Sequence, residues 1–271
     1  MRLVFLGTAA AEGYPAPFCT CPNCQRAREL GGRNIRLRSS VLINDDLLID
    51  FCDLVPAAAF YRVELSKVET LLITHNHADH LWAEQFFLHA HPFTRVPVPE
   101  MAVYAPRDAI ERIRRLSERT PEEARYSLHP VSAGEHWTRG RYHFWAVRAT
   151  HSTEEPLLYI IQDGEKKVFY STDTGRYLPE TWERIKEHTF DAVIIDETMG
   201  TIPTGPRSGH LGLDAVIEYR QLFAKEGLLR PGAHFIAHHF SHGANPSYEE
   251  LVSLLGEHDI EVAYDGWRLE L

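Results

Sequence analysis

Short apolar runs rich in β-branched and aromatic residues recur along the chain and predict its strands. They lie at residues 3–6, 41–43, 47–49, 70–73, 142–147, 157–161, 168–170, 192–195 and 235–237. Most of them are only three to five residues long. Runs of this length that carry few polar residues are typical of strands buried inside a sheet.

Amphipathic segments between these runs predict helices at residues 78–88, 108–116, 179–186, 213–223 and 248–254. In the fourth segment, Leu213, Val216 and Phe223 fall on one stripe, and Asp214 lies near the amino end, where the helix dipole favours an acid. No linker rich in Gly, Ser or Pro divides the chain. We therefore expect a single α/β domain over residues 1–271, in which helices enclose sheets.

The stretch from residue 88 to residue 136 is the least regular part of the sequence and carries six prolines. It can be interpreted as a frame around a pocket or as a plain connection. Nothing in it has the spacing of metal ligands, so the sequence leaves both interpretations open.

Composition and charge narrow the class of protein. The chain is 44% hydrophobic and 24% charged, which is ordinary for a soluble globular protein. No apolar run approaches the roughly 20 residues that cross a bilayer. The apolar stretch at the amino terminus is too short for a signal peptide. We expect a cytoplasmic protein with no membrane contact. A formal charge of -10 argues against stable nucleic-acid binding, although bound divalent ions would add positive charge at a local site.

The densest group of candidate ligands follows the run at residues 70–73. His75, His77, Asp79 and His80 fall within six positions. Imidazole nitrogen and carboxylate oxygen suit borderline divalent ions such as zinc, with manganese and iron as further options. A strand ending in a tight loop can direct the first two histidines toward one ion and Asp79 and His80, on a following helical turn, toward a second. We expect half of a two-metal site; the alternative is a histidine-rich surface loop.

Three further polar residues follow strand-like runs and are candidates for the other half of the site. They are His151, Asp173 and His239. Side chains at the ends of rigid strands can converge on one cleft with little reorganisation. Each alone would be an ordinary polar residue near a turn, but together they complete a set of seven ligands.

A separate cluster, Cys19, Cys21 and Cys24, has the spacing C-x-C-x-x-C. In an intracellular chain such cysteines are more typical of metal ligands or free thiols than of disulfides. Three thiolates need a fourth donor to complete a tetrahedral zinc site, and Cys52 or a histidine must supply it. A redox or surface-thiol role is the alternative.

The motif His-x-His-x-Asp-His, followed by a later His, an Asp and a final His, resembles the metallo-β-lactamase superfamily over nearly the whole chain. The resemblance implies a four-layer αββα sandwich. It also implies one metal on His75, His77 and His151, a second on Asp79, His80 and His239, and a bridge between them through Asp173. Asp50 resembles the buried acid that the superfamily places behind its ligands.

A narrower resemblance, to the PhnP-type phosphodiesterases, rests on a Gly-rich turn at residues 7–15, the cysteine cluster, His239-Phe240-Ser241-His242 and Tyr264-Asp265-Gly266. It implies that His242 completes a structural zinc site with Cys19, Cys21 and Cys24. It also implies that His210 stabilises the transition state or donates a proton, and Arg207 nearby could help to hold a phosphate. PqqB proteins share the Gly-rich start and the cysteine cluster but generally lack the complete histidine motif.

These resemblances imply two divalent transition metals, zinc or manganese with iron as a further option, and one structural zinc. A hydroxide shared by the two metals and held by Asp173 would attack the phosphorus of a small cyclic or nucleotide-like phosphodiester, with His210 assisting. The resemblance also suggests a homodimer. The alternatives are a lactone or thioester hydrolase of the same superfamily and a PqqB-like accessory or binding protein without catalysis.

Overall fold

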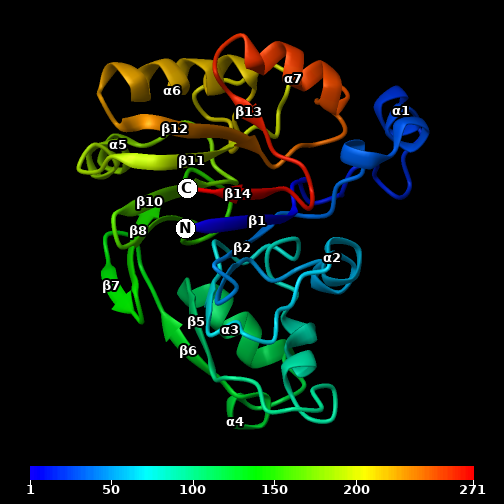
Figure 1. Ribbon diagram of the computed structural model, residues 1–271, viewed down its shortest axis with the longest axis vertical. Coiled ribbons are helices and arrows are strands. Elements are labelled where there is room, and N and C mark those ends of the chain that lie inside the picture. Colours follow the sequence, from blue (N-terminus) through cyan, green and yellow to red (C-terminus); the bar gives the residue numbers. More distant parts are fainter.

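The computed structural model describes all residues 1–271, which form two seven-stranded sheets that pack face to face (Figure 1). The first sheet contains β1 (Arg2–Gly7), β2 (Ser40–Ile43), β3 (Leu47–Ile49), β4 (Thr70–Leu72), β5 (Met101–Ala105), β6 (Tyr126–Pro130) and β14 (Arg268–Glu270). The second contains β7 (His136–Arg139), β8 (Tyr142–Arg148), β9 (Leu157–Asp163), β10 (Lys166–Ser171), β11 (Phe190–Asp196), β12 (Leu229–His238) and β13 (Glu261–Val262). The strand orders are β14-β1-β2-β3-β4-β5-β6 and β13-β12-β11-β10-β9-β8-β7.

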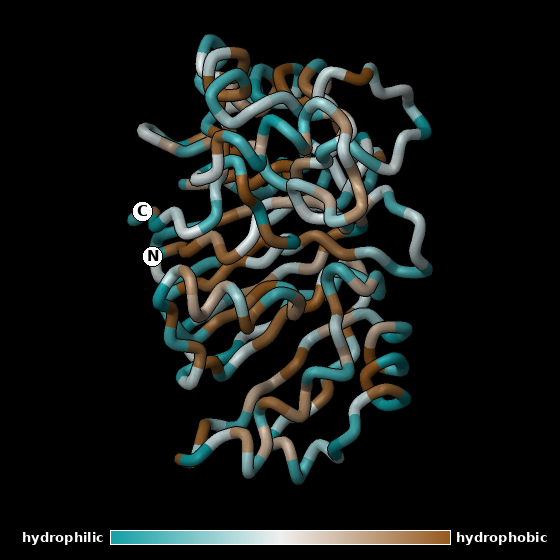
Figure 2. The backbone as a smooth tube through the Cα atoms, turned by 90° about the vertical axis from the view of Figure 1, so that its right-hand side faces the viewer, coloured by the Kyte–Doolittle hydropathy of each residue, from teal (hydrophilic) through white to brown (hydrophobic).

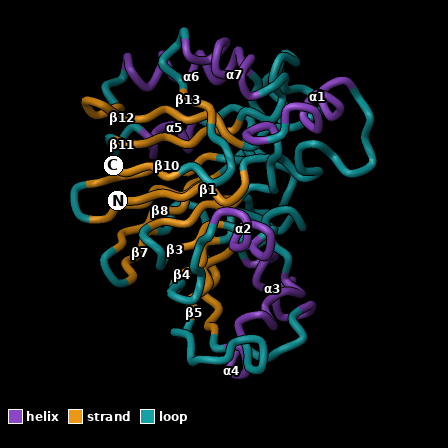
Figure 3. The backbone as a smooth tube through the Cα atoms, turned by 45° about the vertical axis from the view of Figure 1, so that its right-hand side comes forward, coloured by secondary structure: helices purple, strands orange, loops and turns teal.

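Helices cover the outer faces of both sheets, so the molecule has four layers (Figure 3). The helices of the chain are α1 (Pro22–Leu30), α2 (Leu54–Tyr61), α3 (Arg107–Leu116), α4 (Pro121–Ala124), α5 (Pro179–Ile185), α6 (Leu213–Lys225) and α7 (Tyr248–Gly256), with 3-10 helices η1 (Gly32–Asn34) and η2 (Ala83–His89). Helix α1 lies to the side of the sheets (Figure 1). The expected αββα architecture is confirmed. None of the helices combines the length and the apolar character that a bilayer crossing requires.

Strand β1 shows how the pattern of apolar residues builds two cores. Leu3 and Phe5 belong to the core between the sheets, whereas Val4 and Leu6 belong to the core between the first sheet and its helices. Because side chains alternate across a strand, a continuous apolar run buries both faces. Hydrophobic stretches accordingly run along the central strands in Figure 2, with polar residues at outer turns.

The expected strands are all present, but five strands were not expected. These are β5, β6, β7, β13 and β14. β5 and β6 lie in the proline-rich stretch, where parallel pairing with β4 extends the first sheet. This stretch is therefore more regular than its composition indicates. β7, with its exposed polar residues, is an edge strand and lacks the apolar run that marks a buried one.

The prediction of a helix over residues 78–88 is wrong for its first half. Residues 78–80 form a turn, and helical structure begins only at Ala83 as η2. The reason is a backbone pairing with the loop after β3. Phe51 donates its N–H to the His80 carbonyl at 2.7 Å, and Trp82 donates to the Phe51 carbonyl at 2.7 Å. These bonds hold the chain extended at Leu81 and prevent a continuous helix.

Candidate metal centre

Parallel strand pairing brings the candidate ligands to one edge of each sheet. In the second sheet, β10, β11 and β12 run parallel, and the register pairs Ser171 with Ile195 and Asp196 with His238. The residues that follow these strand ends therefore lie close together. In the first sheet, the parallel pair β3 and β4 aligns Ile49 with Leu72, which places Asp50 beside the histidine segment.

Three residues of this region have a left-handed backbone although none is glycine. Asp50 has φ 61°, Asp173 has φ 54° and His239 has φ 68°, and each directly or closely follows a strand. This conformation is uncommon for residues with a side chain and is concentrated at functional sites. Here it turns the chain sharply at the strand end, so that each side chain points toward the site.

The first ligand group is formed by His75, His77 and His151. His77 Nδ1 lies 3.1 Å from His75 Nε2 and 3.1 Å from His151 Nε2. The second group is formed by Asp79, His80, Asp173 and His239. His80 Nε2 lies 3.3 Å from Asp79 Oδ2, 3.2 Å from His239 Nε2 and 2.6 Å from Asp173 Oδ2.

Asp173 joins the two groups. Its Oδ2 lies 3.4 Å from His75 Nε2 in the first group and 3.2 Å from His239 Nε2 in the second. Its Oδ1 lies 3.7 Å from His151 Nε2. The structure therefore brings all seven expected ligands into one cluster, with Asp173 in the middle.

The spacing of these atoms fits divalent ions. A tetrahedral zinc ion with nitrogen ligands at about 2.05 Å holds neighbouring ligand atoms about 3.3 Å apart. The nitrogen and oxygen atoms above lie 2.6–3.7 Å apart. Three imidazole nitrogens that face one another at 3.1 Å cannot all donate hydrogen bonds, whereas all three can donate lone pairs to one cation.

The other nitrogen of most of these histidines has a fixed partner. His80 Nδ1 lies 2.6 Å from Asp50 Oδ2, His239 Nδ1 lies 2.8 Å from Thr198 Oγ1, and His75 Nδ1 lies 3.0 Å from Thr74 Oγ1. Such contacts fix the ring and leave Nε2 free as a ligand atom. Asp50 is fully buried and also accepts the backbone N–H of Thr74 at 2.9 Å.

The cluster attracts positive charge. Burial lowers the pKa of His80, but the charges of Asp50, Asp79 and Asp173 outweigh it and raise that pKa well above its usual value. Burial raises the pKa of Asp173, yet His239 and His80 bring it well below its usual value. A site rich in carboxylates that stay ionised can stabilise a bound cation.

His210 lies at the edge of the cluster between two acids. Its Nδ1 is 3.2 Å from Asp173 Oδ1 and 3.3 Å from Asp196 Oδ2. Burial lowers the pKa of His210, but Asp196 and then Asp173 raise it to about 9. His210 is therefore protonated at neutral pH, with Nδ1 facing the acids and Nε2 available to another molecule. Arg207, by contrast, is exposed and lies outside the residues that line the cavity.

The cluster opens into a cavity of about 240 Å³. Its lining includes His77, His151, His210 and His239, together with Glu12 from the first loop of the chain. It includes no lysine or arginine and no residue of the stretch from 88 to 136. The interpretation of that stretch as a frame around the pocket gains no support here.

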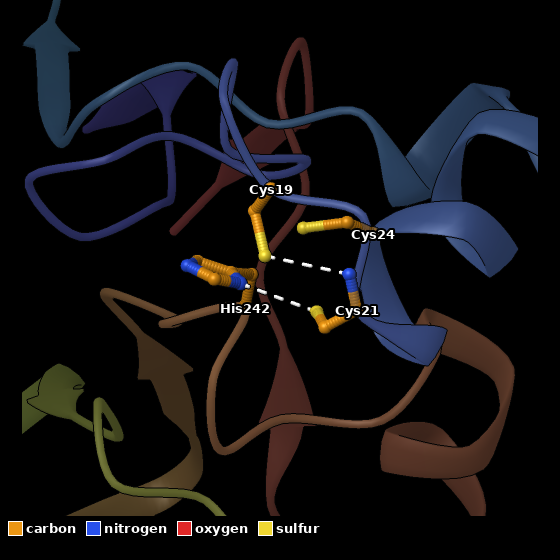
Figure 4. Close-up of side chains that lie close together, drawn as sticks. All are labelled: Cys19, Cys21, Cys24 and His242. Atoms are coloured by element: carbon orange, nitrogen blue, oxygen red, sulfur yellow. Dashed lines mark hydrogen bonds between the residues drawn. The ribbon is translucent and has the colours of Figure 1, made fainter.

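The cysteine cluster forms a second site next to this cavity. Cys19, Cys21, Cys24 and His242 point toward one another (Figure 4), and their ligand atoms all lie within 4.8 Å. Cys21 Sγ lies 3.5 Å from His242 Nδ1. A hydrogen bond from the backbone of Cys24, and then the contact with His242, lower the pKa of Cys21 to about 6. A thiolate at neutral pH suits a zinc ligand.

Cys52, the other candidate for a fourth donor, lies outside this cluster. Its buried thiol donates to the Ser39 carbonyl at 3.3 Å. A histidine, not Cys52, is therefore the donor that the structure places beside the three cysteines.

Two residues of the site were not expected from the sequence. Asp196 ends β11, where it contacts His210 and accepts the backbone N–H of Leu211 at 2.9 Å. Thr198 orients His239. Asp196 ends an apolar run much as Asp173 follows one, so the criterion of an acid at a strand end could have identified it; Thr198 carries no such signal.

Comparisons with known proteins identify the family of this fold. Residues 48–230 match the family model described as beta-lactamase superfamily domain, and the chain therefore belongs to that family. The metallo-β-lactamase resemblance is thus confirmed, and with it a metal-dependent hydrolase fold whose His and Asp cluster can hold divalent metals. A search of curated proteins gives no match.

Solved structures show the same fold at low sequence identity. A diphosphatase from the PhnP family is 23% identical with a TM-score of 0.75, over 100% of this chain and 97% of that chain. Zn²⁺-bound PqqB from Methylobacterium extorquens is 18% identical with a TM-score of 0.75, over 100% of both chains. The metallo-beta-lactamase fold protein YhfI from Bacillus subtilis is 16% identical with a TM-score of 0.70, over 99% of both chains.

Proposed function

We propose that this chain is a dinuclear metal-dependent phosphodiesterase that acts on a small cyclic or nucleotide-like phosphodiester. One observation carries the proposal: two groups of metal-ligating atoms meet at Asp173, and His210 Nδ1 lies 3.2 Å from Asp173 Oδ1. The similarity to a diphosphatase from the PhnP family supports chemistry at phosphorus.

The ligands proposed for the two ions are those that the structure groups together. His75, His77 and His151 would hold one ion, Asp79, His80 and His239 would hold the other, and Asp173 would contact both. When bound, the two ions would lower the pKa of water from about 15.7 toward about 7 and neutralise negative charge on the phosphoryl group. Zinc and manganese both suit these ligands.

The protein's own contribution centres on His210. Because its Nδ1 faces Asp173 and Asp196, its Nε2–H is the group that can reach a substrate. There it would donate a hydrogen bond to a phosphoryl oxygen or a proton to the leaving alkoxide. The cavity lining contains no lysine or arginine, so His210 is its one protein cation toward the phosphoryl group.

The cysteine cluster is proposed to hold a structural zinc ion. His242 follows β12 by four residues and His239 by three, so a metal on Cys19, Cys21, Cys24 and His242 would fix the loop that carries His239. Asn23 already holds this loop by donating to the His242 carbonyl at 2.9 Å. We also propose that residues 1–271 act as one domain, because the ligands come from both sheets.

The experiment that tests this function is elemental analysis of the purified protein together with a hydrolysis panel of phosphodiesters, lactones and thioesters. We expect hydrolysis of bis(p-nitrophenyl) phosphate that disappears with chelation and returns with zinc or manganese. Preferred hydrolysis of a lactone or thioester would assign the site to a carboxylic bond instead. No hydrolysis of any compound by the metal-loaded protein would favour a PqqB-like accessory role.

A further inference from the structure

A large groove lies beside the metal cavity and has no assigned role. It has a volume of about 920 Å³ and lies between residues 11–19 on one side and residues 35–38 on the other. It shares Ala11 and Glu12 with the lining of the metal cavity. The groove therefore borders the metal cavity at these two residues.

The groove is lined largely by apolar residues, some of them exposed. Phe18 is fully exposed and Ile35 is 40% exposed, on opposite sides of the groove. Leaving large apolar side chains in water is unfavourable, and such patches mark binding surfaces. A flat aromatic ring such as Phe18 favours another planar group as its partner.

The charged residues of the groove are either paired or buried within the protein. Arg38 donates its Nε–H to Asp53 at 2.9 Å, and Glu12 accepts a hydrogen bond from Ser241 at 2.6 Å. Arg36 forms no ion pair, but it is buried: one terminal nitrogen donates to the Ala263 carbonyl at 2.6 Å, and the other is shielded from solvent without a partner. No exposed, unpaired cation therefore remains for a second anionic group, so the groove favours an uncharged one.

The walls of the groove are held in place before any ligand binds. Tyr14 donates its N–H to the Arg36 carbonyl at 3.0 Å, and Arg36 donates its N–H to the Tyr14 carbonyl at 2.6 Å. Arg28 further ties the first wall by donating to the Ala16 and Cys19 carbonyls, both at 2.9 Å. A preformed surface of this kind binds without a large ordering cost.

We propose that this groove binds a planar, uncharged organic group of the substrate, such as an aromatic ring or a nucleobase, while the phosphoryl group lies at the metal centre. This inference rests on the proposed function and deepens it, because it names the class of ester group. Phe18 and Ile35 are then specificity-determining residues that contact the organic group.

The test compares phenylphosphonate with methylphosphonate by titration calorimetry on the zinc-loaded protein. Both probes carry the same anionic head, so their affinity ratio reports the contribution of the ring. We expect phenylphosphonate to bind about tenfold more tightly, as burial of one ring face predicts. Phe18→Ala and Ile35→Ala should each reduce this ratio to about threefold or less.

Phe60→Ala is the matched control, because Phe60 is also exposed but does not line the groove. It should leave the ratio unchanged. Phe18→Ala could change the affinity ratio indirectly through the neighbouring Cys19, whereas Ile35→Ala changes the opposite wall of the groove. Zinc content is measured for every variant. Equal affinity of the two phosphonates, absence of binding by both, or an unchanged ratio in both groove variants would overturn the inference.

The same variants distinguish a substrate group in the groove from a second copy of the chain, and the role of the groove from the proposed reaction. Sedimentation of the wild type and Phe18→Ala tests whether a second copy of the chain covers the groove. A dimer that the substitution dissociates, with an unchanged phosphonate ratio, would overturn the proposed occupant. A ring preference without hydrolysis of any diester would support the proposed role of the groove and refute the proposed reaction. Diester hydrolysis without a ring preference would support the reaction and refute the role of the groove.

Discussion

His210 shows how a single residue acquires a function from its surroundings. It lies in a loop, but two acids at the ends of neighbouring strands face its Nδ1 and hold its pKa at about 9 against the effect of burial. A surface histidine has no such partners and is mostly neutral at pH 7. The position of Asp196 therefore decides whether His210 can act as an acid.

We expect His210→Ala to lower kcat for bis(p-nitrophenyl) phosphate about a hundredfold with metal content unchanged, because a general acid contributes at least that factor. Asp196→Asn should lower kcat by a smaller factor, about tenfold, since the amide keeps the shape but loses the charge that favours protonated His210. Steady-state kinetics and elemental analysis check both variants. Unchanged turnover in His210→Ala would remove this residue from the mechanism.

Asp50 acts on the metal centre without reaching the cavity. It is fully buried and accepts hydrogen bonds from the Thr74 N–H and from His80. In Asp50→Ala these buried donors lose their acceptor, so we expect the free energy of unfolding to fall by about 3 kcal/mol. We also expect metal affinity to fall by about 10-fold to 100-fold, because His80 is no longer oriented.

Denaturant titration and competition with a chelator measure these two effects of Asp50→Ala. Asp50→Asn is the control, because its amide oxygen can still accept the Thr74 bond while the charge is lost. Full stability and full metal affinity in Asp50→Ala would show that the residue only fills space.

At the scale of elements, the loop that carries His210 packs directly on the loop after β10. A Cβ atom on Gly175 would lie 1.8 Å from the Ser208 carbonyl oxygen, a distance that real atoms do not reach. Only glycine therefore allows the two loops to approach so closely. This contact places His210 beside Asp173.

We expect Gly175→Ala to displace the 205–210 loop and to lower kcat at least tenfold, with a loss of about 1–3 kcal/mol in the free energy of unfolding. Gly205→Ala, in the same loop, is the matched control because no atom lies within 4 Å of its added methyl group. Kinetics and thermal unfolding of both variants check this. Equal activity of the two variants would contradict the packing argument.

How far the sequence predicts these elements depends on burial. Strands such as β1 and β11 are buried along nearly their whole length, so their apolar runs predicted them correctly. β7 is an exposed edge strand, and the pairing of Phe51 with Leu81 that shortens the helix after His80 is a long-range contact. Neither the edge strand nor the long-range pairing produces a local pattern of apolar residues, so the sequence predicted neither.

The seven residues that the structure brings together could be proposed as ligands from the sequence, because metal binding restricts both residue type and spacing. The criterion of an acid at a strand end also selects Asp196, but its role depends on the distance to His210, which the sequence does not contain. The groove beside Phe18 also has no local signal, since its two walls are brought together by long-range backbone pairing, such as that of Tyr14 with Arg36.

At the scale of the whole molecule, the proposed metals connect parts of the chain that are distant in sequence. His75 and His80 follow a strand of the first sheet, whereas Asp173 and His239 follow strands of the second. An ion bound between these residues would stabilise the packing of one sheet against the other. Ligands that bind only the folded chain stabilise it by mass action, by about 4 kcal/mol at a thousandfold excess over Kd.

We therefore expect chelation to lower the midpoint of thermal unfolding by about 10 °C, and added zinc to restore it. The variant Cys24→Ser distinguishes the cysteine cluster from the dinuclear site. The wild type should hold about three ions per chain and the variant about two. The midpoint difference between metal-loaded and metal-stripped protein should be smaller in the variant than in the wild type. Because the midpoint difference is taken within one protein, any effect of the serine on packing cancels. Equal ion counts in the wild type and Cys24→Ser, with an undiminished midpoint difference, would show that the cysteine cluster holds no metal.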